Sequence, residues 1–396
     1  MSGPVLHGQA LQGDGLTRAR TPDGRTVDHL EGPARGVLHD LHLRATVLPG
    51  SEERDLWVTG GVVTYEPVPS AVTVATGVWV LPGLVDAHCH IGLDRCGPVP
   101  AATAEAQAVI DRDAGVCLVR DAGSPSDTRW IDQRDDLPAI VRAGQHVART
   151  KRYLRDYAVE VEPDDLVATV VEQARRGDGW VKLVGDWIDR SLGDLAPSWP
   201  ADVVAEAIVA AHAEGARVTA HCFAEQAPAE LVVAGIDGIE HGTGLDDTTI
   251  ALMAERGTSL VPTLANIEIF PGIAAQAEER FPVYAAHMRD LYARRHDTLR
   301  KAHEAGVPIF AGTDAGGHGA HGRIGDEVVT LGGVIGTEGA LGAASWRARQ
   351  WLGWPGLGEG SPADLVVLTR DPRLELTSVR EPALVVRAGR VVAAAA

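Results

Sequence analysis

Cysteine is scarce in this chain, and no two of the four cysteines form a C-x-x-C pair: they are Cys89, Cys96, Cys117 and Cys222. This scarcity excludes a disulfide framework and a structural zinc site built from cysteine. Long apolar runs are also missing. No stretch approaches the ~18 residues of a membrane span, and the N-terminus has no signal-peptide core. We therefore expect a cytoplasmic protein with no membrane partner.

Positive charge is the second deficit. The 396 residues include 36 basic and 54 acidic side chains, which gives a net charge of −18. Such a balance disfavours a nucleic-acid partner held through phosphate contacts. Lysine is rarer still, because all the basic residues are arginine except Lys151, Lys182 and Lys301. A lysine that falls in an apolar segment of this chain therefore calls for a specific chemical reason.

The two ends of the chain differ in style from its middle. Residues 1–36 are rich in glycine, proline and charge without a period, and we expect a poorly ordered or surface-lying extension. Residues 37–82 alternate short β-prone runs with glycine and proline turns, which predicts a small antiparallel sheet module. The segment 354–396 is β-like again, and we expect it to return to that module. A free C-terminal hairpin is the alternative, although it would be marginally stable alone.

The middle segment, residues 83–353, repeats a strand followed by a helix. Apolar residues make up 45% of the chain, enough for a sizeable core. Eight such repeats predict a (β/α)₈ barrel, whose usual size is about 250 residues. A Rossmann-type sheet is the alternative, but no G-x-G-x-x-G follows an early strand. The predicted strands cover residues 84–88, 116–120, 139–143, 180–184, 217–221, 238–241, 259–263 and 308–312.

Polar side chains stand where several of these strands end. The first strand runs into His88-Cys-His90, and residues i and i+2 of an extended strand point to the same side, so both imidazoles can reach one metal ion. Barrel enzymes carry their chemistry at this end of the strands. Taken singly, each histidine can be structural and Asp314 can be a helix cap. Their convergence predicts a metal site, and the further strand-end residues are Lys182, His221, His241 and Asp314.

Lys182 is the most informative of them, since it lies in the apolar strand 180–184. Burial disfavours an ammonium group and lowers its pKa, so the neutral amine can add CO₂. The resulting carbamate has two oxygens that can bridge two metal ions. The alternative is a buried lysine paired with Asp186 or Asp314. Asp314 suits a general base that takes a proton from the attacking water and delivers it to the leaving nitrogen.

These residues resemble the amidohydrolase superfamily of metal-dependent hydrolases over about residues 55–396. The matching segments are Pro82-Gly-Leu-Val-Asp-Ala-His88-Cys-His90, Val119-Arg-Asp-Ala-Gly123, Val181-Lys182-Leu183, Val218-Thr-Ala-His221, Gly238-Ile-Glu-His241, Ala311-Gly-Thr-Asp314 and Ala363-Asp-Leu-Val-Val-Leu368. The subgroup that looks most similar contains imidazolonepropionase-like proteins and metal-dependent prolidases. Imidazolonepropionases proper use one metal and lack the fourth-strand lysine, so Lys182 favours the two-metal branch.

The resemblance implies a distorted (β/α)₈ barrel, with a β-sandwich built from both chain ends. It implies two divalent ions, zinc in the first place. By this resemblance His88 and His90 hold the more buried ion, and Lys182 bridges as a CO₂-derived carbamate. His221 and His241 hold the second ion, while Asp314 binds the first ion and acts as the base.

The expected reaction is hydrolysis of a C–N bond in a non-peptide amide, a cyclic amide or a dipeptide-like small molecule by metal-activated hydroxide. A deaminase or lactonase of the same superfamily ranks second, and a non-catalytic scaffold ranks last. Deaminases usually carry a Glu three residues after the fifth-strand histidine, whereas here Glu225 stands four residues on. The sequence leaves homo-oligomer formation open. Weaker candidates for substrate contacts are His146, Arg152, Tyr153, His318, His321 and Arg323.

Overall fold

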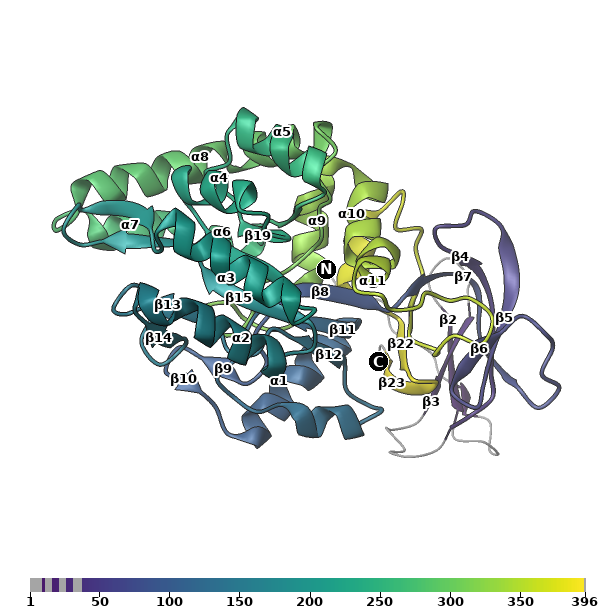
Figure 1. Ribbon diagram of the computed structural model, residues 1–396. Helices are drawn as coiled ribbons and strands as arrows, with labels where there is room; N and C mark the ends of the chain where they lie inside the picture. Colours follow the sequence, from purple (N-terminus) through teal and green to yellow (C-terminus); the bar gives the residue numbers. More distant parts are fainter. Residues whose placement is uncertain (1–8, 11–15, 21–25, 31–37, 395–396) are drawn as a thin grey trace.

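The protein is described by a computed structural model that covers residues 9–10, 16–20, 26–30 and 38–394. Two sheet systems meet in it: one at the right of Figure 1, and the parallel strands with their helices at the left. Among the described residues, no helix is both long and apolar enough to pass through a bilayer.

Both ends of the chain contribute strands to one ten-stranded sheet. Its central strand is the eleven-residue β7, which pairs in parallel with β4 and antiparallel with β21. Alternate residues of β4 point into a separate apolar core, as expected of a strand with one buried face. The strands from 38 onward are β4 (Leu41–Val47), β5 (Glu53–Thr59), β6 (Val62–Thr64), β7 (Val72–Pro82), β21 (Leu365–Leu368), β22 (Leu384–Arg387) and β23 (Arg390–Ala394).

The predicted extension 1–36 lies largely outside the described residues. Within it, the described backbone forms β1 (Gln9–Ala10), β2 (Leu16–Arg20) and β3 (Thr26–Leu30). Strand β3 pairs antiparallel with β7 at the edge left open by β21. Strand β2 pairs antiparallel with β3, and β1 pairs antiparallel with β2, so the three strands extend the sheet outward from β7.

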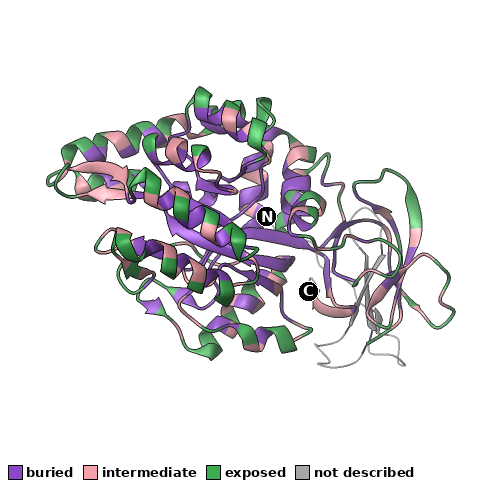
Figure 2. Ribbon diagram, viewed as in Figure 1, coloured by how far each residue is buried: buried purple, intermediate pink, exposed green. Residues whose placement is uncertain are grey.

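The parallel strands are almost entirely buried, because helices cover the outside of these sheets (Figure 2). They form two hydrogen-bonded groups, β12-β11-β8 and β14-β13-β15-β18-β19-β20. Strands that the sequence predicts are found within two residues of the expected bounds. The strands are β8 (Leu84–Cys89), β11 (Val116–Asp121), β12 (Ala139–Arg142), β13 (Val147–Arg149), β14 (Val159–Val161), β15 (Trp180–Val184), β18 (Arg217–Cys222), β19 (Gly238–His241) and β20 (Ser259–Val261).

The eighth predicted strand, 308–312, is not a regular strand, and this expectation needs correction. Only Ile309 forms a bridge, with Leu260 of β20. Pro308 has no N–H to donate to a ladder, which limits pairing there. The segment nevertheless connects the two groups of strands. The Leu260 N–H donates to the Pro308 carbonyl, and the Ala87 N–H of β8 donates to the Ala311 carbonyl, both at 2.8 Å.

The predicted helices between the strands are present: α1 (Ala101–Asp113), α2 (Leu166–Arg176), α3 (Ala201–Ala213), α4 (Gln226–Val233), α5 (Asp247–Arg256) and α8 (Pro282–Glu304). The local sequence explains the ends of α5. The Asp246 side chain accepts a hydrogen bond from the Thr249 N–H, and Gly257 takes a left-handed conformation at the other end. Helix α8 begins at Pro282, a favourable first helical residue.

Several elements were not predicted. Strands β13 and β14 are two of them. Short β9 (Leu93–Asp94) and β10 (Gly97–Pro98) follow β8, and the hairpin β16 (Asp186–Asp189) and β17 (Asp194–Pro197) follows β15. The remaining helices gather before and after the eighth-strand segment. They are α6 (Leu264–Ile267), α7 (Phe270–Ala277), α9 (Ile324–Ile335), α10 (Thr337–Ala344) and α11 (Trp346–Trp351).

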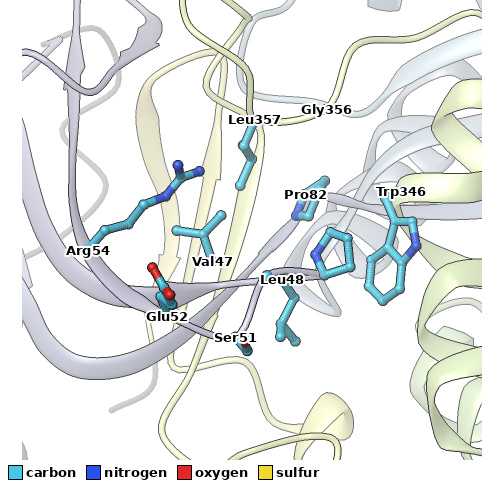
Figure 3. Close-up of a pocket in the computed structure, with 11 residues that line it drawn as sticks. Val47, Leu48, Ser51, Glu52, Arg54, Pro82, Trp346, Gly356 and Leu357 are labelled. Carbon is cyan, nitrogen blue, oxygen red and sulfur yellow. The ribbon is translucent and has the colours of Figure 1, made fainter.

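A cavity of about 520 Å³ lies at the junction of the ten-stranded sheet and α11. Figure 3 shows Leu48, Pro82 and Trp346 on one side of it and the charged pair Glu52 and Arg54 on the other. None of the eleven residues that line this cavity is a strand-end residue singled out by the sequence. The chemistry therefore has to be sought at the ends of the parallel strands.

Candidate active site

Three of the predicted side chains converge on one point at the end of β8. The Nε2 atoms of His88 and His90 lie 3.2 Å apart, and each lies 3.2 Å from Oδ1 of Asp314. Both histidines are buried, while Asp314 is partly exposed. A peptide hydrogen bond fixes the relative position of the segments, since the Asp314 N–H donates to the His88 carbonyl at 2.7 Å.

The Nδ1 atoms of His88 and His90 form hydrogen bonds outside the trio. Nδ1 of His88 donates to the Glu240 carboxylate at 2.7 Å, and Nδ1 of His90 donates to the Gly123 carbonyl at 2.8 Å. The Nε2 lone pairs therefore face each other and Asp314, and they need a proton or a cation among them. Ligands of a tetrahedral zinc ion stand about 3.3 Å apart, so the trio fits a divalent cation.

A second histidine pair stands beside the first. The rings of His221 and His241 have centroids 4.7 Å apart, and His241 lies 5.2 Å from His88. Nδ1 of His241 is 2.7 Å from the Thr263 hydroxyl, whereas Nε2 of His221 is buried without a hydrogen-bond partner. Burial lowers the pKa of His241 to about 3 and that of His221 well below its usual value. Both rings are therefore neutral and can offer a lone pair to a cation.

Lys182 lies in the middle of β15, whose five residues are all buried. It is only 2% exposed. Burial lowers the pKa of its amine to about 8, against the opposing charges of Glu240 and Asp314. The neutral amine that carbamate formation requires is therefore accessible near neutral pH.

Asp314 is ionised, although burial alone would protonate it. Its neighbours His88, His90 and His241 hold its pKa well below the usual range. Its second oxygen, Oδ2, accepts a hydrogen bond of 2.6 Å from the side-chain amide of Asn266. Backbone strain marks the same place, since His241, Thr263 and Asp314 all have positive φ angles of 46–65°. Non-glycine residues hold such angles where the surroundings impose them, often at functional sites.

The model of the amidohydrolase family matches residues 79–392 of the chain, from the end of β7 to β23. The chain belongs to the amidohydrolase family. It is therefore a hydrolase that acts on carbon–nitrogen bonds, and the family expectation of a divalent metal agrees with the three-ligand geometry of His88, His90 and Asp314.

Curated relatives of this amidohydrolase include uncharacterized proteins of Mycobacterium tuberculosis and Mycobacterium bovis. Each is 56% identical over 368 residues, which cover 92% of this chain and 99% of the relative. Solved structures with the same fold include a Xaa-Pro dipeptidase with bound methionine, at 22% identity and a TM-score of 0.74, covering 89% of this chain and 99% of that one. A prolidase complexed with N-methylphosphonate-L-proline has 23% identity and a TM-score of 0.77 at the same coverage. These likenesses establish a (β/α)₈-like fold.

Two of the predicted substrate contacts of the amidohydrolase stand next to the histidines. The ring of His146 lies 5.6 Å from that of His90, and the ring of Tyr153 lies 5.6 Å from that of His221. Nδ1 of His146 donates to the Gly123 carbonyl at 3.0 Å, which leaves a buried Nε2 lone pair without a partner. Burial lowers the pKa of His146 well below its usual value, so it is a neutral acceptor.

The other predicted contacts are engaged elsewhere or exposed. Arg152 forms an ion pair with Asp189 at 2.8 Å. His321 donates to Asp111 at 2.8 Å and lies beside Cys89, so its Nδ1 faces the outer side of β8. Arg323 pairs with Asp326 at 3.1 Å, and His318 is exposed in the loop after Asp314.

Glu240 is a member of the site that the sequence reasoning missed, although it precedes His241 in the same strand. It is fully buried and accepts hydrogen bonds from His88, Arg120 and Thr219. Burial raises its pKa, but Arg120, Lys182 and His88 together hold that pKa well below its usual range. The sequence did contain a signal for Glu240, because it is a charged residue in a short strand whose other members are Gly238, Ile239 and the predicted metal ligand His241.

We expect Glu240→Gln to destabilise the protein by about 3–5 kcal/mol, because it leaves the fully buried Arg120 guanidinium without a counter-charge. Denaturant unfolding of metal-free protein measures this. The matched control is Glu225→Gln, which removes a half-exposed carboxylate paired with Arg294 and should cost less than about 1 kcal/mol. Equal effects of the two substitutions would contradict this account of Glu240.

Glu327 of α9 is a second missed residue, and it acts from behind the site. Its two carboxylate oxygens accept the Leu264 and Ala265 N–H groups at 3.0 and 2.7 Å. It thereby holds the turn that carries Thr263 against His241 and Asn266 against Asp314. Burial raises its pKa to about 8.

This shift predicts a pH dependence of stability. The folded state keeps the Glu327 proton up to about pH 8, whereas the unfolded chain releases it near pH 4.5. The stability from this group is present below pH 4.5 and lost as pH rises through 8. Relative to Glu327→Gln, wild-type protein should lose about 1.4 kcal/mol per pH unit between those values. Unfolding free energies of both proteins from pH 5.5 to 8.5 measure it, and a constant difference would contradict it.

Proposed function

We propose that this amidohydrolase cleaves a C–N bond in a small non-peptide amide, cyclic amide or dipeptide-like substrate, with Asp314 as general base and then general acid. The observation that carries the proposal is the meeting of His88, His90 and Asp314 at mutual distances of 3.2 Å. Lys182, His221 and His241 stand around this trio on the neighbouring strands β15, β18 and β19.

Two divalent ions, with zinc the first choice, would be held there by His88, His90, His221, His241 and Asp314 and bridged by a carbamate on Lys182. The donor set supports this assignment, because it combines neutral imidazoles, a carboxylate and an amine with a lowered pKa. Ions bound in such a site make hydroxide available near neutral pH and polarise a carbonyl group.

The protein's own groups handle the proton. Asp314 is ionised and can accept the proton of the attacking water through Oδ1 while Asn266 fixes Oδ2. The same carboxyl then gives that proton to the departing nitrogen. Glu240 keeps the Nδ1–H of His88 in place, so that the tautomer with an inward Nε2 lone pair persists.

Deamination is less well supported. Glu225, the carboxylate that follows His221 by four residues, points away from the histidines. It forms ion pairs with His287 and Arg294 of α8 and is half exposed. No deaminase-type carboxylate from this loop therefore reaches the site. Lactone hydrolysis proceeds by the same attack on a carbonyl group as amide hydrolysis. Only a test with both kinds of substrate distinguishes the two activities.

We also propose the architecture that the family resemblance implies. The parallel strands close into a distorted barrel through the segment 308–315, which is hydrogen-bonded to β20 on one side and to β8 on the other. In this proposal the barrel comprises residues 83–353. The sheet shared by 37–82 and 354–396 forms the second, β-sandwich domain.

The decisive experiment is a screen of purified protein loaded with zinc against N-acyl amino acids, Xaa-Pro dipeptides, lactams and hydantoins. Aminated heterocycles and simple lactones are included as the competing classes. We expect cleavage among the amides, with metal analysis showing about two ions per chain. Release of ammonia from heterocycles alone would favour the deaminase. Cleavage of lactones alone would be consistent with attack on a carbonyl group but would refute the proposed preference for C–N bonds. An active, folded, metal-free enzyme would refute the proposal.

A further inference from the structure

We infer that the substrate portion bound beside His221 is uncharged and aromatic or apolar, so that neutral amides are preferred over substrates bearing a carboxylate. This inference rests on the proposed function and concerns its substrate class. Three observations carry it: an aromatic wall next to the histidines, the engagement of the nearby cations, and the charge at the outer edge of the site.

The wall consists of Tyr153 from the loop after β13, Trp187 from strand β16, and Phe223, which follows β18. The ring of Trp187 lies 4.8 Å from Tyr153 and 5.3 Å from His221, and the ring of Phe223 lies 4.2 Å from His221. An apolar cluster around Phe270 supports Phe223 and Trp187 from behind. Tyr153 and Trp187 remain partly exposed, so their faces are accessible beside buried histidines. Aromatic faces of this kind favour flat or apolar ligand groups.

A carboxylate bound here would need a cation, and the nearby guanidinium is already engaged. Nη1 of Arg152 donates to Asp189 at 2.8 Å, and Nη2 donates to the carbonyls of Trp187 and Ala196 at 3.1 and 3.0 Å. These bonds fasten the β16–β17 hairpin, which carries Trp187. The two-pronged geometry that binds a carboxylate is therefore used within the protein. The Nε atom of Arg152 is buried and has no hydrogen-bond partner among the described residues.

The polar atoms that remain available near the site are mostly uncharged. Nε2 of His146 and the hydroxyl of Tyr157 are both buried and have no hydrogen-bond partner among the described residues. Tyr157 is 4% exposed, and its pKa is raised to about 12 by burial and by Asp94 and Asp314, so it is a neutral donor. An amide offers one N–H and one carbonyl, which matches one acceptor and one donor.

Acidic side chains act on Tyr157. Asp94 and Asp314 raise the pKa of its hydroxyl, and the exposed Arg95 lowers it. A carboxylate placed against the aromatic wall would lose its hydration beside Arg152, whose guanidinium is already engaged, and it would face these aspartates. A neutral group avoids both costs. The discriminating residues are therefore Trp187 and Tyr153, which contact the substrate, and Arg152, which supports the wall.

The test compares secondary amides that contain the same scissile bond and differ only by a carboxylate: acetanilide with 4-acetamidobenzoate, and N-benzylacetamide with N-acetylphenylglycine. We expect kcat/KM of the zinc-loaded enzyme to be at least tenfold higher for the neutral member of each pair. Calorimetry on metal-free protein, where turnover is absent, should show the same order of Kd. Trp187→Ala should raise KM for acetanilide about tenfold, and Trp187→Phe should restore it.

A preference for the carboxylate member, or equal kcat/KM and equal Kd, would overturn the inference while leaving the proposed hydrolysis intact. Arg152→Met tests the remaining Nε–H. We expect the ratio of kcat/KM for the neutral substrate to kcat/KM for the carboxylate substrate to stay within about threefold of its wild-type value. A fall in kcat/KM for the carboxylate substrate alone would also overturn the inference. If neither member is cleaved, the ratio of Kd values decides. Absence of any amide cleavage in the wider screen would instead refute the proposed function.

Discussion

Replacing Asp314 by asparagine is expected to lower kcat by a factor of about 10²–10⁴ on any amide that the wild-type enzyme cleaves. Asparagine retains the size and one oxygen of the side chain, but it cannot accept a proton from water and return it to the leaving nitrogen. The remaining oxygen can face His88 and His90, where the cation would bind, at the expense of the hydrogen bond that Asn266 donates to Oδ2. Metal content should therefore change little.

The measurement is steady-state kinetics with metal analysis on the same preparation. Asp326→Asn is the matched control, because Asp326 is an exposed aspartate of α9 that pairs with Arg323 and Arg380. Its kcat should remain within about twofold. Near-wild-type turnover of Asp314→Asn would show that another group carries the proton. Loss of metal in that variant would show instead that Asp314 is needed chiefly as a ligand.

Lys182→Ala is expected to lower metal content from about two ions per chain to about one and to reduce turnover by at least about 10²-fold. The reason is that the proposed bridging carbamate is lost and the remaining groups are no longer held at the reacting distance. Stability of the metal-free protein should not fall in proportion, because the substitution removes a buried amine for which burial is unfavourable. Short carboxylates such as acetate should restore part of the metal content by occupying the emptied space.

Lys301→Ala is the natural comparison for Lys182→Ala. Lys301 is exposed on α8, where it pairs with Asp247 at 2.9 Å. Metal content, turnover and acetate response should be unchanged in this variant. Full metal content in Lys182→Ala would contradict the bridging role and would favour a lysine that merely pairs with the carboxylates around it.

Asp314 and Glu240 show how far sequence reasoning reaches in this site. Asp314, like the four histidines, could be singled out because it stands at or near the end of an apolar segment, and parallel strands bring their ends together. Lys182 could be singled out because it is a rare lysine within an apolar strand. Glu240 also lies at the end of a strand, one residue before His241. Its role nevertheless depends on Arg120, which lies 120 residues earlier in the chain. No local pattern specifies that pairing.

Arg152 marks the boundary most clearly. From the sequence it is a free cation beyond the third strand and a reasonable partner for a substrate carboxylate. In the folded protein, Asp189 and two carbonyls of the β16–β17 hairpin accept hydrogen bonds from Arg152, because the hairpin lies against the loop that carries this arginine. Glu327 and Asn266 depend on tertiary structure in the same way. Glu327 binds the first N–H groups of α6, and Asn266 of that helix donates directly to Asp314.

By itself, the sequence determined the alternation of strand and helix and the resemblance to the amidohydrolase family, and it singled out the residues proposed to bind a metal. The first follows from period, the second from short matching segments, and the third from position and residue chemistry, all of which are local properties of the chain. Only the tertiary structure decided which nitrogen of each histidine faces inward, which cations are free, and that the segment 308–312 joins β20 to β8 without forming a regular strand. Those properties depend on hydrogen bonds between residues far apart in sequence, which form only when the chain has folded.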